Sequence, residues 1–512
     1  EENKSSSKPT DFNSNADVGG GEDIAPKDFK PVDKKLKSIT NETFEDKRKS
    51  LTKADEHGYI YGNMPEPNFG KESALIVYKD YLSRFRTHIA KHNIVYKSEG
   101  PKYQRWIAQQ FKKFNNENKK TVMYLVKEFE MKKAATAYKR ASTDKTGIID
   151  PLKLPSYKYN DDIFKKLTII PDGKNHGMIM LLDWSGSMAD TLMNTVEQLI
   201  NLVQFVKKVN IPFEVYFFTS ERRKENGSWK QKVGDYCYDE FSLVNCASHK
   251  MNKRELDEAL TYLFSMAKDY NSRWVNRSDY YNHMNEKGVS YDMPREFNLG
   301  NTPLNEALIY MTHLVPMFRK KYGIEKLTFI TLTDGGANSM SGYQLTDPKD
   351  NEHSFLKDDN FGRKNFHGKH MVITRKKKKH VIDRYYGAQT GTLLNILKEE
   401  NNCNIVGFFI LKRIRRWDIE RYIDAKDYWD REKQYSLLRK EMTKNKSIAV
   451  TCDGYDKYFI LDGKKMNVEN FNMNDVTVKK ATPSEFKRIF GKSMANRLVS
   501  RVVLNKFIAE VA

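Results

Sequence analysis

The chain has 512 residues, enough to bury a sizeable core and to form up to about three domains, which excludes a small scaffold held together by disulfides or metals. Charged residues make up 30% and hydrophobic residues 39% of the sequence, and the net charge is +21, so we expect a globular, polar and basic protein. The four cysteines form no CxxC pair, which disfavours a disulfide framework and a zinc ribbon and favours a reducing compartment.

The N-terminal part divides into a linker and a helical module. Residues 1–70 are rich in Ser, Lys, Asp, Asn and Gly with only scattered apolar residues, which predicts a disordered linker. From there to about residue 141, apolar residues recur every three or four positions, which is the spacing of one face of a helix. We expect a helical module over residues 71–170.

Strands and helices then alternate, which predicts a doubly wound, mostly parallel α/β sheet over residues 171–465. The first strand, a continuous apolar run at 178–182, is typical of a strand buried on both faces of a parallel sheet. Two long polar insertions, at 221–252 and 339–387, leave the carboxyl ends of strands, where such folds place their binding sites. The other predicted strands are 213–218, 327–332 and 405–411, and the predicted helices are 192–206, 256–266, 304–318 and 393–397.

A strand pair and a helix are expected at the end of the chain. Residues 448–450 and 458–461 surround a turn-like Asp453-Gly454 pair, which is typical of two adjacent strands. Residues 466–512 carry apolar residues at helical spacing among basic ones, which predicts an amphipathic helix that packs on the domain or on a partner.

No segment has the character of a membrane span or a signal peptide. The longest uninterrupted apolar run, 405–411, is far shorter than the roughly 20 residues that a membrane helix needs. The first residues lack the apolar core of a signal peptide. We therefore expect a cytoplasmic protein without a membrane partner.

The informative motif is a DxSxS sequence at the end of the first predicted strand. Asp183, Ser185 and Ser187 place a carboxylate and two hydroxyls around a tight turn that contains Gly186. These oxygens can point at one spot, and hard oxygen ligands suit Mg²⁺. The alternative is that Asp183 and Ser185 only cap the following helix, because such residues are ordinary signals of a helix start.

Two further segments place an oxygen donor at the same kind of strand-to-helix edge. Thr302 lies in a Gly-Asn-Thr-Pro-Leu sequence just before a predicted helix, and Asp334 follows the predicted strand 327–332. This trio of segments, in this order, resembles the von Willebrand factor A (VWA) domain and its metal-ion-dependent adhesion site, and VWA domains have a Rossmann-like α/β fold. The resemblance implies a complete site made of five residues: Asp183, Ser185, Ser187, Thr302 and Asp334.

The resemblance also implies how such a site works. In VWA domains both serines and, in one state, the threonine bind the metal directly, while the aspartates act largely through water. Mg²⁺ prefers about six oxygen ligands and keeps some waters, so mostly neutral ligands leave the ion electrophilic and one position open. A carboxylate of another protein fills that position. We expect Mg²⁺ or Mn²⁺ as the cofactor and a protein as the ligand.

A hydrolase is the enzymatic alternative for the two serines. Ser185 or Ser187 as a nucleophile would need an adjacent histidine, and no GxSxG motif surrounds them although His176 and His313 exist. We therefore assign no catalytic residue and expect no catalytic activity from the chain alone.

A narrower resemblance begins just upstream of the first strand. A basic segment at 138–141 and a Gly-x-Ile-Asp-x-x-Lys-Leu element within 146–154 lead into the DxSxS strand. This arrangement resembles the VWA subunit of aerobic cobaltochelatase, the CobT type, copies of which also occur in large tailed bacteriophages. The wider family pairs with an AAA+ ATPase of the MoxR or CobS type, and the chain has no GxxxxGK[ST] motif, so the ATPase would be a separate protein. The resemblance thus implies an adaptor between that ATPase and a client, in a bacterial cell or a phage-infected host.

Two other functions remain open. A dense basic run, together with the net charge, favours attraction to nucleic acid, so an RNA-binding VWA protein similar in plan to the Ro family is one alternative. A solvated loop is the simpler interpretation of this run. The other alternative is a subunit of a cobaltochelatase that takes part in the insertion of metal into a tetrapyrrole. The basic run consists of Arg375, Lys376, Lys377, Lys378 and Lys379.

Overall fold

The structure is a computed structural model of the chain and describes most of residues 59–462. These residues belong to one compact unit, His57–Ala512. The expected disorder of residues 1–58 and the expected C-terminal helix at 466–512 lie outside the described residues. The internal gaps are 71–72, 141, 157, 160–163, 170–174, 221–228, 231–234, 238–240, 275–292, 335, 339–341, 345–362, 366–369, 377, 383–385, 412–413 and 446.

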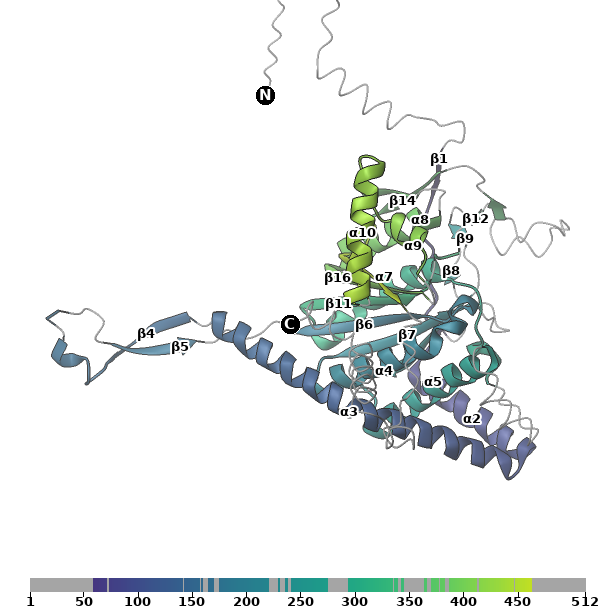
Figure 1. The fold of residues 1–512 in the computed structure, drawn as a ribbon, viewed down its shortest axis with the longest axis horizontal. Coiled ribbons are helices and arrows are strands. Elements are labelled where there is room, and N and C mark those ends of the chain that lie inside the picture. The colour runs from purple at the N-terminus through teal and green to yellow at the C-terminus, as the bar shows by residue number, and fades with distance from the viewer. Residues whose placement is uncertain are drawn as a thin grey trace, which may run out of the picture. The chain divides into compact units, whose positions relative to one another are not determined.

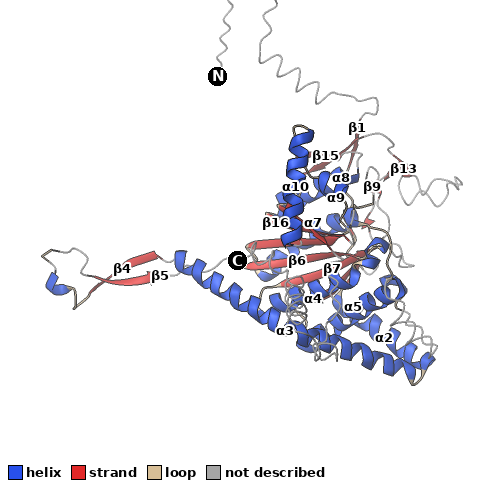
Figure 2. Cartoon of the chain, in the orientation of Figure 1, coloured by secondary structure: helices blue, strands red, loops and turns tan. Residues whose placement is uncertain are grey.

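An eight-stranded sheet, ordered β17-β18-β16-β11-β6-β7-β10-β3, forms the centre of the larger unit (Figures 1 and 2). From β18 to β7 each strand is parallel to its neighbour, whereas β17 and β10 run antiparallel to β18 and β7. The predicted doubly wound, mostly parallel α/β fold of the VWA and Rossmann-like kind is confirmed. The strands are β3 (Leu75–Ile76), β6 (His176–Asp183), β7 (Phe213–Thr219), β10 (Ser242–Ser248), β11 (Lys326–Thr333), β16 (Cys403–Leu411), β17 (Ser447–Val450) and β18 (Lys457–Asp462).

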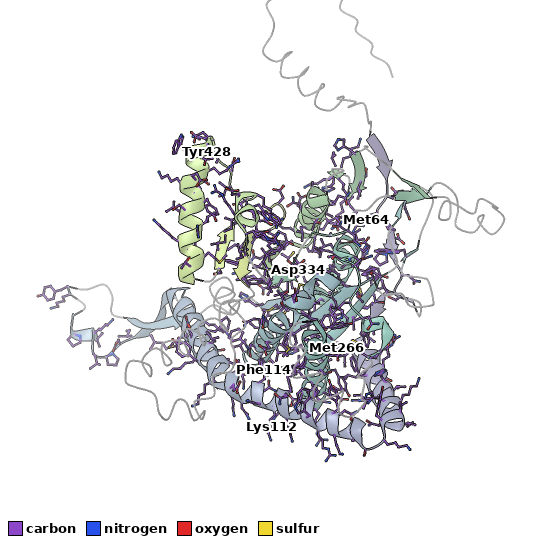
Figure 3. All side chains as sticks on the ribbon, turned by 45° about the vertical axis from the view of Figure 1, so that its right-hand side comes forward. Met64, Lys112, Phe114, Met266, Asp334 and Tyr428 are labelled. Atoms are coloured by element: carbon purple, nitrogen blue, oxygen red, sulfur yellow. The ribbon has the colours of Figure 1, made fainter. Side chains whose placement is uncertain are left out.

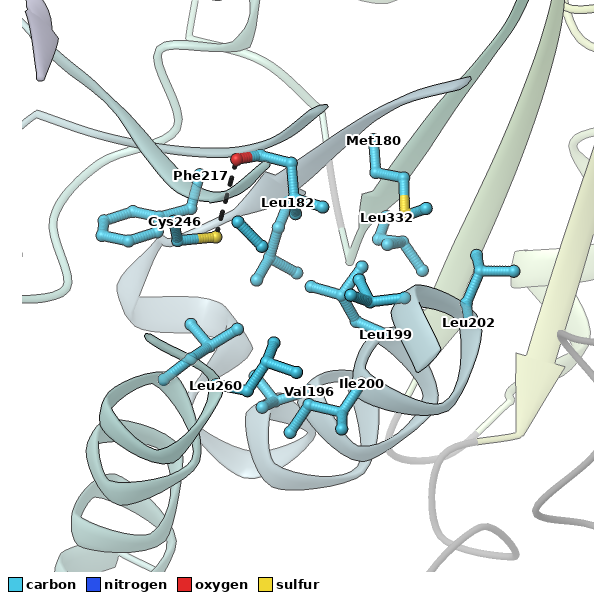
Figure 4. Close-up of a cluster of buried hydrophobic side chains, with 14 of the residues drawn as sticks. Met180, Leu182, Val196, Leu199, Ile200, Leu202, Phe217, Cys246, Leu260 and Leu332 are labelled. Carbon is cyan, nitrogen blue, oxygen red and sulfur yellow. Dashed lines mark hydrogen bonds between the residues drawn. The ribbon is translucent and has the colours of Figure 1, made fainter. Parts of the chain in front are cut away.

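Helices cover both faces of this sheet because alternate side chains of each strand point to opposite sides. In β6, Met178, Met180 and Leu182 pack in one core cluster with residues of α4 and α5, whereas Ile179 and Leu181 pack in another with residues of α7 and α8. Figure 4 shows part of the first cluster, where side chains of α4 meet those of β6 and β11. The helices are α4 (Leu192–Lys208), α5 (Lys253–Trp274), α7 (Leu304–Tyr322) and α8 (Tyr386–Asn401).

Two long helices, α2 (Tyr78–Tyr96) and α3 (Glu99–Arg140), form the expected helical module, whereas the part of the predicted range 71–170 that follows them contains two strands instead of further α-helix. Buried residues such as Phe85 and Phe111 join the same core cluster as α4 and α5, so the module packs directly on the sheet layer. After α3 comes a two-stranded sheet of β4 (Ser142–Ile149) and β5 (Phe164–Ile169), with a short 3-10 turn η1 (Leu154–Ser156) between the strands.

Residues 59–70 differ from the expected linker because they contribute two short strands. β1 (Tyr59–Gly62) pairs with β14 (His370–Arg375), and β2 (Glu66–Pro67) pairs with β8 (Trp229–Lys230). Neither strand is long enough to show an apolar alternation, and each takes its partner from a distant part of the chain. Because the composition of residues 59–70 is that of a linker, the sequence did not indicate these two strands.

The expected polar insertion at 221–252 also differs, because it contains a core strand. β10 is buried along its whole length, although its sequence, Ser-Leu-Val-Asn-Cys-Ala-Ser, mixes polar with apolar residues. Asn245 Nδ2 and Ser248 Oγ donate hydrogen bonds to the buried carboxylate of Glu214 at 2.8 and 3.0 Å. Cys246 Sγ lies 3.7 Å from the carbonyl of Val215 (Figure 4). These partners satisfy most of the polar groups named here, although Asn245 Oδ1 has no hydrogen-bond partner among the described residues, and they allow the strand to enter the core.

The described parts of the other insertion, 339–387, form small sheets. β12 (Gly342–Gln344) lies between β13 (Arg363–Asn365) and β9 (Tyr236–Cys237), and β14 pairs with β15 (Lys378–Ile382). Beyond β16, helices α9 (Arg416–Glu420) and α10 (Tyr428–Asn445) lead to the predicted strand pair, β17 and β18. None of the described helices combines the length and apolar character that a membrane span requires.

Candidate metal centre

Three parallel strands bring the predicted site residues to one edge of the sheet. β6 lies between β7 and β11 and is parallel to both, so the carboxyl ends of all three meet. Asp183 is the last residue of β6, and Asp334 directly follows β11. Asp334 is labelled in Figure 3. Ser185 and Ser187 begin the turn η2 (Gly186–Asp190), which leads into α4.

A chain of hydrogen bonds joins the side chains of this edge. The hydroxyls of Ser185 and Ser187 lie 3.0 Å apart, and Ser187 Oγ donates to Asp334 Oδ1 at 2.9 Å. Thr333 Oγ1 donates to Asp183 Oδ2 at 2.7 Å. Two carboxylates and three hydroxyls therefore converge within a few ångströms of one another.

The loop that carries Thr302 lies against the DxSxS turn through backbone bonds. Gly186 N donates to Gly300 O at 2.8 Å, and Gly300 N donates to Trp184 O at 3.3 Å. The carbonyl of Thr302 accepts a bond from Asn338 N at 2.9 Å, which ties the loop to the segment after β11. The structure thus places the backbone of Thr302 beside the other four residues, and its direct contact with a metal stays a prediction.

The two carboxyl groups share an environment that penalises their negative charge. Burial is the main cause that raises the pKa of Asp183 to about 7, and the charge of Asp334 raises it further, whereas Thr333 and Ser185 offset part of the effect. Burial likewise raises the pKa of Asp334 to about 6, with the hydroxyl of Ser187 acting against it. Asp183 Oδ1 is buried and has no hydrogen-bond partner.

The chemistry of these donors fits a small divalent cation. Mg²⁺ prefers oxygen ligands, and a positive ion beside Asp183 and Asp334 would compensate the charge that burial penalises. Ser185 and Ser187 would hold the ion through their hydroxyls, with Thr302 as a further ligand. Within the described residues, this edge included, no group of three or more His, Cys, Asp or Glu side chains could hold a metal ion, so a cation here would depend on two carboxylates together with hydroxyl ligands.

Sequence reasoning missed several residues that shape this centre. Thr333 orients Asp183, and Ser220 accepts a hydrogen bond of 2.7 Å from Asn301 N in the Thr302 loop. The position of Thr333, directly before Asp334, could have indicated that its hydroxyl takes part in the centre. Nothing in the sequence around Ser220 connects it with residue 301, since only the fold brings these loops together.

The basic run considered for nucleic acid lies mostly at the turn between β14 and β15. Arg375 makes a two-fold ion pair with Glu400 at 2.9 and 3.1 Å, and Lys378 pairs with Glu399 at 2.8 Å. Lys376 Nζ lies 3.8 Å from Glu400. Lys379 is exposed, and Lys377 lies outside the described residues. Part of this positive charge is therefore neutralised by α8.

Comparison with known proteins supplies no family assignment, because no protein family model and no curated protein sequence matches the chain. Solved structures that match include the pilus adhesin SpaC from Lactobacillus rhamnosus GG, at 15% identity and a TM-score of 0.26, over 54% of this chain and 31% of that one. Proximal thread matrix protein 1 from the mussel byssus matches at 12% identity and a TM-score of 0.23, over 54% and 49%.

A third match is the vWF domain of the pilus tip protein Mfa5 from Porphyromonas gingivalis. It has 10% identity and a TM-score of 0.21, over 47% of this chain and 82% of that one. The chain spans about a third to a half of the length of the first two structures. Likenesses this low carry no argument about function, so the case for a metal centre depends on the side chains described above.

Proposed function

We propose that the chain is a Mg²⁺-dependent protein-binding module of the VWA kind. The observation that carries this proposal is the fully buried carboxyl group of Asp183 beside the half-buried carboxyl group of Asp334, at one sheet edge with three hydroxyls and an unpartnered carboxylate oxygen. Such an arrangement costs stability without a cation and would be compensated by one. Mg²⁺ bound there would have an open coordination position that a carboxylate of another protein could fill.

We further propose that the partner is a separate AAA+ ATPase of the MoxR or CobS type, which the chain couples to a client. Support for this step comes from the CobT-like sequence elements upstream of β6 and from the absence of a P-loop motif in the sequence. In this scheme the chain serves a chelatase or chaperone system and performs no catalysis itself.

Co-purification from the native host tests both steps. An AAA+ ATPase should remain bound in a buffer that contains about 5 mM Mg²⁺, a concentration at which weak Mg²⁺ sites are largely filled. The ATPase should be lost when EDTA is added. Asp183→Ala should abolish the association. The exposed Asp257 of α5 gives a matched control, since Asp257→Ala removes a carboxylate far from the motif. Equal retention by both variants, with or without EDTA, would contradict the proposal.

RNA binding is the second candidate, favoured by the net charge of +21 and by the exposed lysines at the β14–β15 turn. Binding through phosphate contacts weakens steeply with salt. If RNA is the ligand, affinity should fall by orders of magnitude between roughly 50 and 200 mM salt and should not change in Asp183→Ala. Indifference to salt together with dependence on Asp183 would exclude it.

A further inference from the structure

Helix α2 of the helical module reaches the turn that precedes the Thr302 loop. This turn is the short 3-10 element η3 (Arg295–Phe297). Arg84 Nη1 donates to Glu296 Oε1 at 2.8 Å, and Phe85 stacks on Phe297 with ring centroids 5.3 Å apart and planes inclined by 8°. α2 therefore holds the turn by an ion pair and by a stacked ring.

Phe297 connects this contact with the DxSxS motif. Its side chain is fully buried, and its carbonyl accepts a hydrogen bond of 2.8 Å from Nε1 of Trp184, the residue between Asp183 and Ser185. Trp184 is itself fully buried, and its ring lies 4.8 Å from that of Phe217. A displacement of the turn would therefore disturb the motif as well as the loop.

From the turn to Thr302 the loop is bonded at successive positions. Tyr270 OH accepts from Leu299 N at 3.0 Å, and Thr219 Oγ1 donates to Asn298 O at 2.8 Å. Gly300, Asn301 and Thr302 continue the series with the bonds described for the metal centre. A Cβ on Gly300 would lie 2.5 Å from Ser220 Oγ, so the loop packs closely against its neighbours at that point. A backbone held in this way transmits a shift at one end to the other.

We propose that Arg84 and Phe85 are positioning residues for the metal centre. Acting through Glu296 and Phe297, helix α2 sets the place of the Thr302 loop and thereby the affinity for Mg²⁺. The inference rests on the proposed function and adds to it a coupling between the helical module and the cation. Linkage requires the reverse effect too, so bound Mg²⁺ would tighten α2 on the sheet.

A second ion pair on the same helix provides a matched control. Arg86 makes a two-fold contact with Glu258 of α5, at 2.8 and 2.6 Å, and this contact does not involve the η3 turn. Arg84→Met and Arg86→Met each remove one partly exposed ion pair between α2 and its surroundings. A purely structural role of Arg84 predicts the same outcome for both variants.

Calorimetric titration of the full-length chain with MgCl₂ separates the two interpretations. We expect Arg84→Met to bind Mg²⁺ roughly 5-fold more weakly than wild type, at the lower end of what coupled sites show, and Arg86→Met to bind within about two-fold of wild type. The charge swap R84E/E296R should recover most of the lost affinity. Thermal unfolding without Mg²⁺ should show similar small losses for both single variants.

Hydrogen exchange supplies a second readout. Mg²⁺ should slow amide exchange in α2 of the wild type and should do so less in Arg84→Met. The inference is overturned if Arg84→Met binds like wild type, or if Arg84→Met and Arg86→Met weaken binding equally. A wild type that takes up no Mg²⁺ would instead refute the proposed function, so the two failures are distinguishable.

Discussion

At the scale of single residues, the candidate metal centre holds the carboxyl groups of Asp183 and Asp334 in surroundings that destabilise their charged forms. Asp183 is fully buried, and burial together with Asp334 holds the pKa of its carboxyl near 7. The folded chain without a cation therefore either carries a proton there or bears an uncompensated charge. A group kept under such a penalty is typical of a functional site rather than of a structural cap.

Replacing this carboxyl by its neutral isostere should separate stability from binding. Asp183→Asn should raise the free energy of unfolding without Mg²⁺ at pH 8 by on the order of 1–4 kcal/mol, because no charge is buried. The same variant should bind Mg²⁺ roughly 10–100-fold more weakly, as expected for a residue that acts through water. Thermal unfolding and calorimetry measure the two effects.

Asp418 is a suitable control for that variant, since it is also buried but accepts a 2.7 Å bond from Arg415 N at the start of α9. Asp418→Asn should lose stability and keep Mg²⁺ affinity. If Asp183→Asn is instead less stable than wild type in the absence of Mg²⁺, the electrostatic account of the centre is wrong.

The raised pKa values also set a pH dependence. Between about pH 4 and pH 7 the folded, cation-free chain keeps protons on Asp183 and Asp334 that the unfolded chain releases, so the contribution of these groups to stability falls as the pH rises. Mg²⁺ binds the deprotonated carboxylates. The rise in melting temperature on adding MgCl₂ should therefore be larger at pH 8 than at pH 5.5, and an equal rise at both values would contradict the assignment.

The sequence was most informative about residues that follow strands. Asp183, Ser185, Ser187 and Asp334 stand next to apolar runs, and parallel strands bring such positions to one edge, so their convergence could be predicted. The supporting contacts of Phe297 could not, because its partners come from α2 and from the DxSxS turn more than a hundred positions away.

At the scale of elements, close packing around β16 leaves no room for a side chain at Gly407. Gly407 faces the rings of Tyr455 and Tyr458, and a Cβ there would lie 2.7 Å from Tyr455 Cε1. Gly407→Ala should therefore lower the free energy of unfolding by about 1–3 kcal/mol, the usual cost of overpacking a core. Gly336→Ala, where a Cβ would meet nothing within 4 Å, should change stability little. Chemical denaturation of the two variants provides the comparison.

The strands that the sequence predicted and the strands that it missed differ in how they are buried. β6, β11 and β16 lie inside a parallel sheet, and they read as mostly apolar runs, although threonines interrupt the run of β11. β10 mixes apolar residues with polar ones, two of which bond to Glu214, and β3 has only two residues, so neither forms a long continuous apolar run. Pairing partners, rather than composition, decide that these segments are strands.

At the scale of the whole molecule, the described contacts lie within His57–Ala512. A chain that begins at Phe69 lacks β1 and β2 and should melt at a lower temperature than a chain that begins at His57, which keeps both strands. Differential scanning calorimetry of both truncations checks this, and equal melting temperatures would show that the two short strands contribute little to stability.

The short strands of residues 59–76 have a consequence for the order of folding. Within fewer than twenty residues the chain pairs Tyr61 with Val372, Pro67 with Trp229, and Ile76 with Val244, in three different sheets. During synthesis, β1 must wait for some three hundred further residues before it can find its partner, whereas the partners of β2 and β3 are made sooner. Completion of the native structure therefore depends on translation past residue 372, and a ribosome-bound chain without that residue would still expose β1 to proteases.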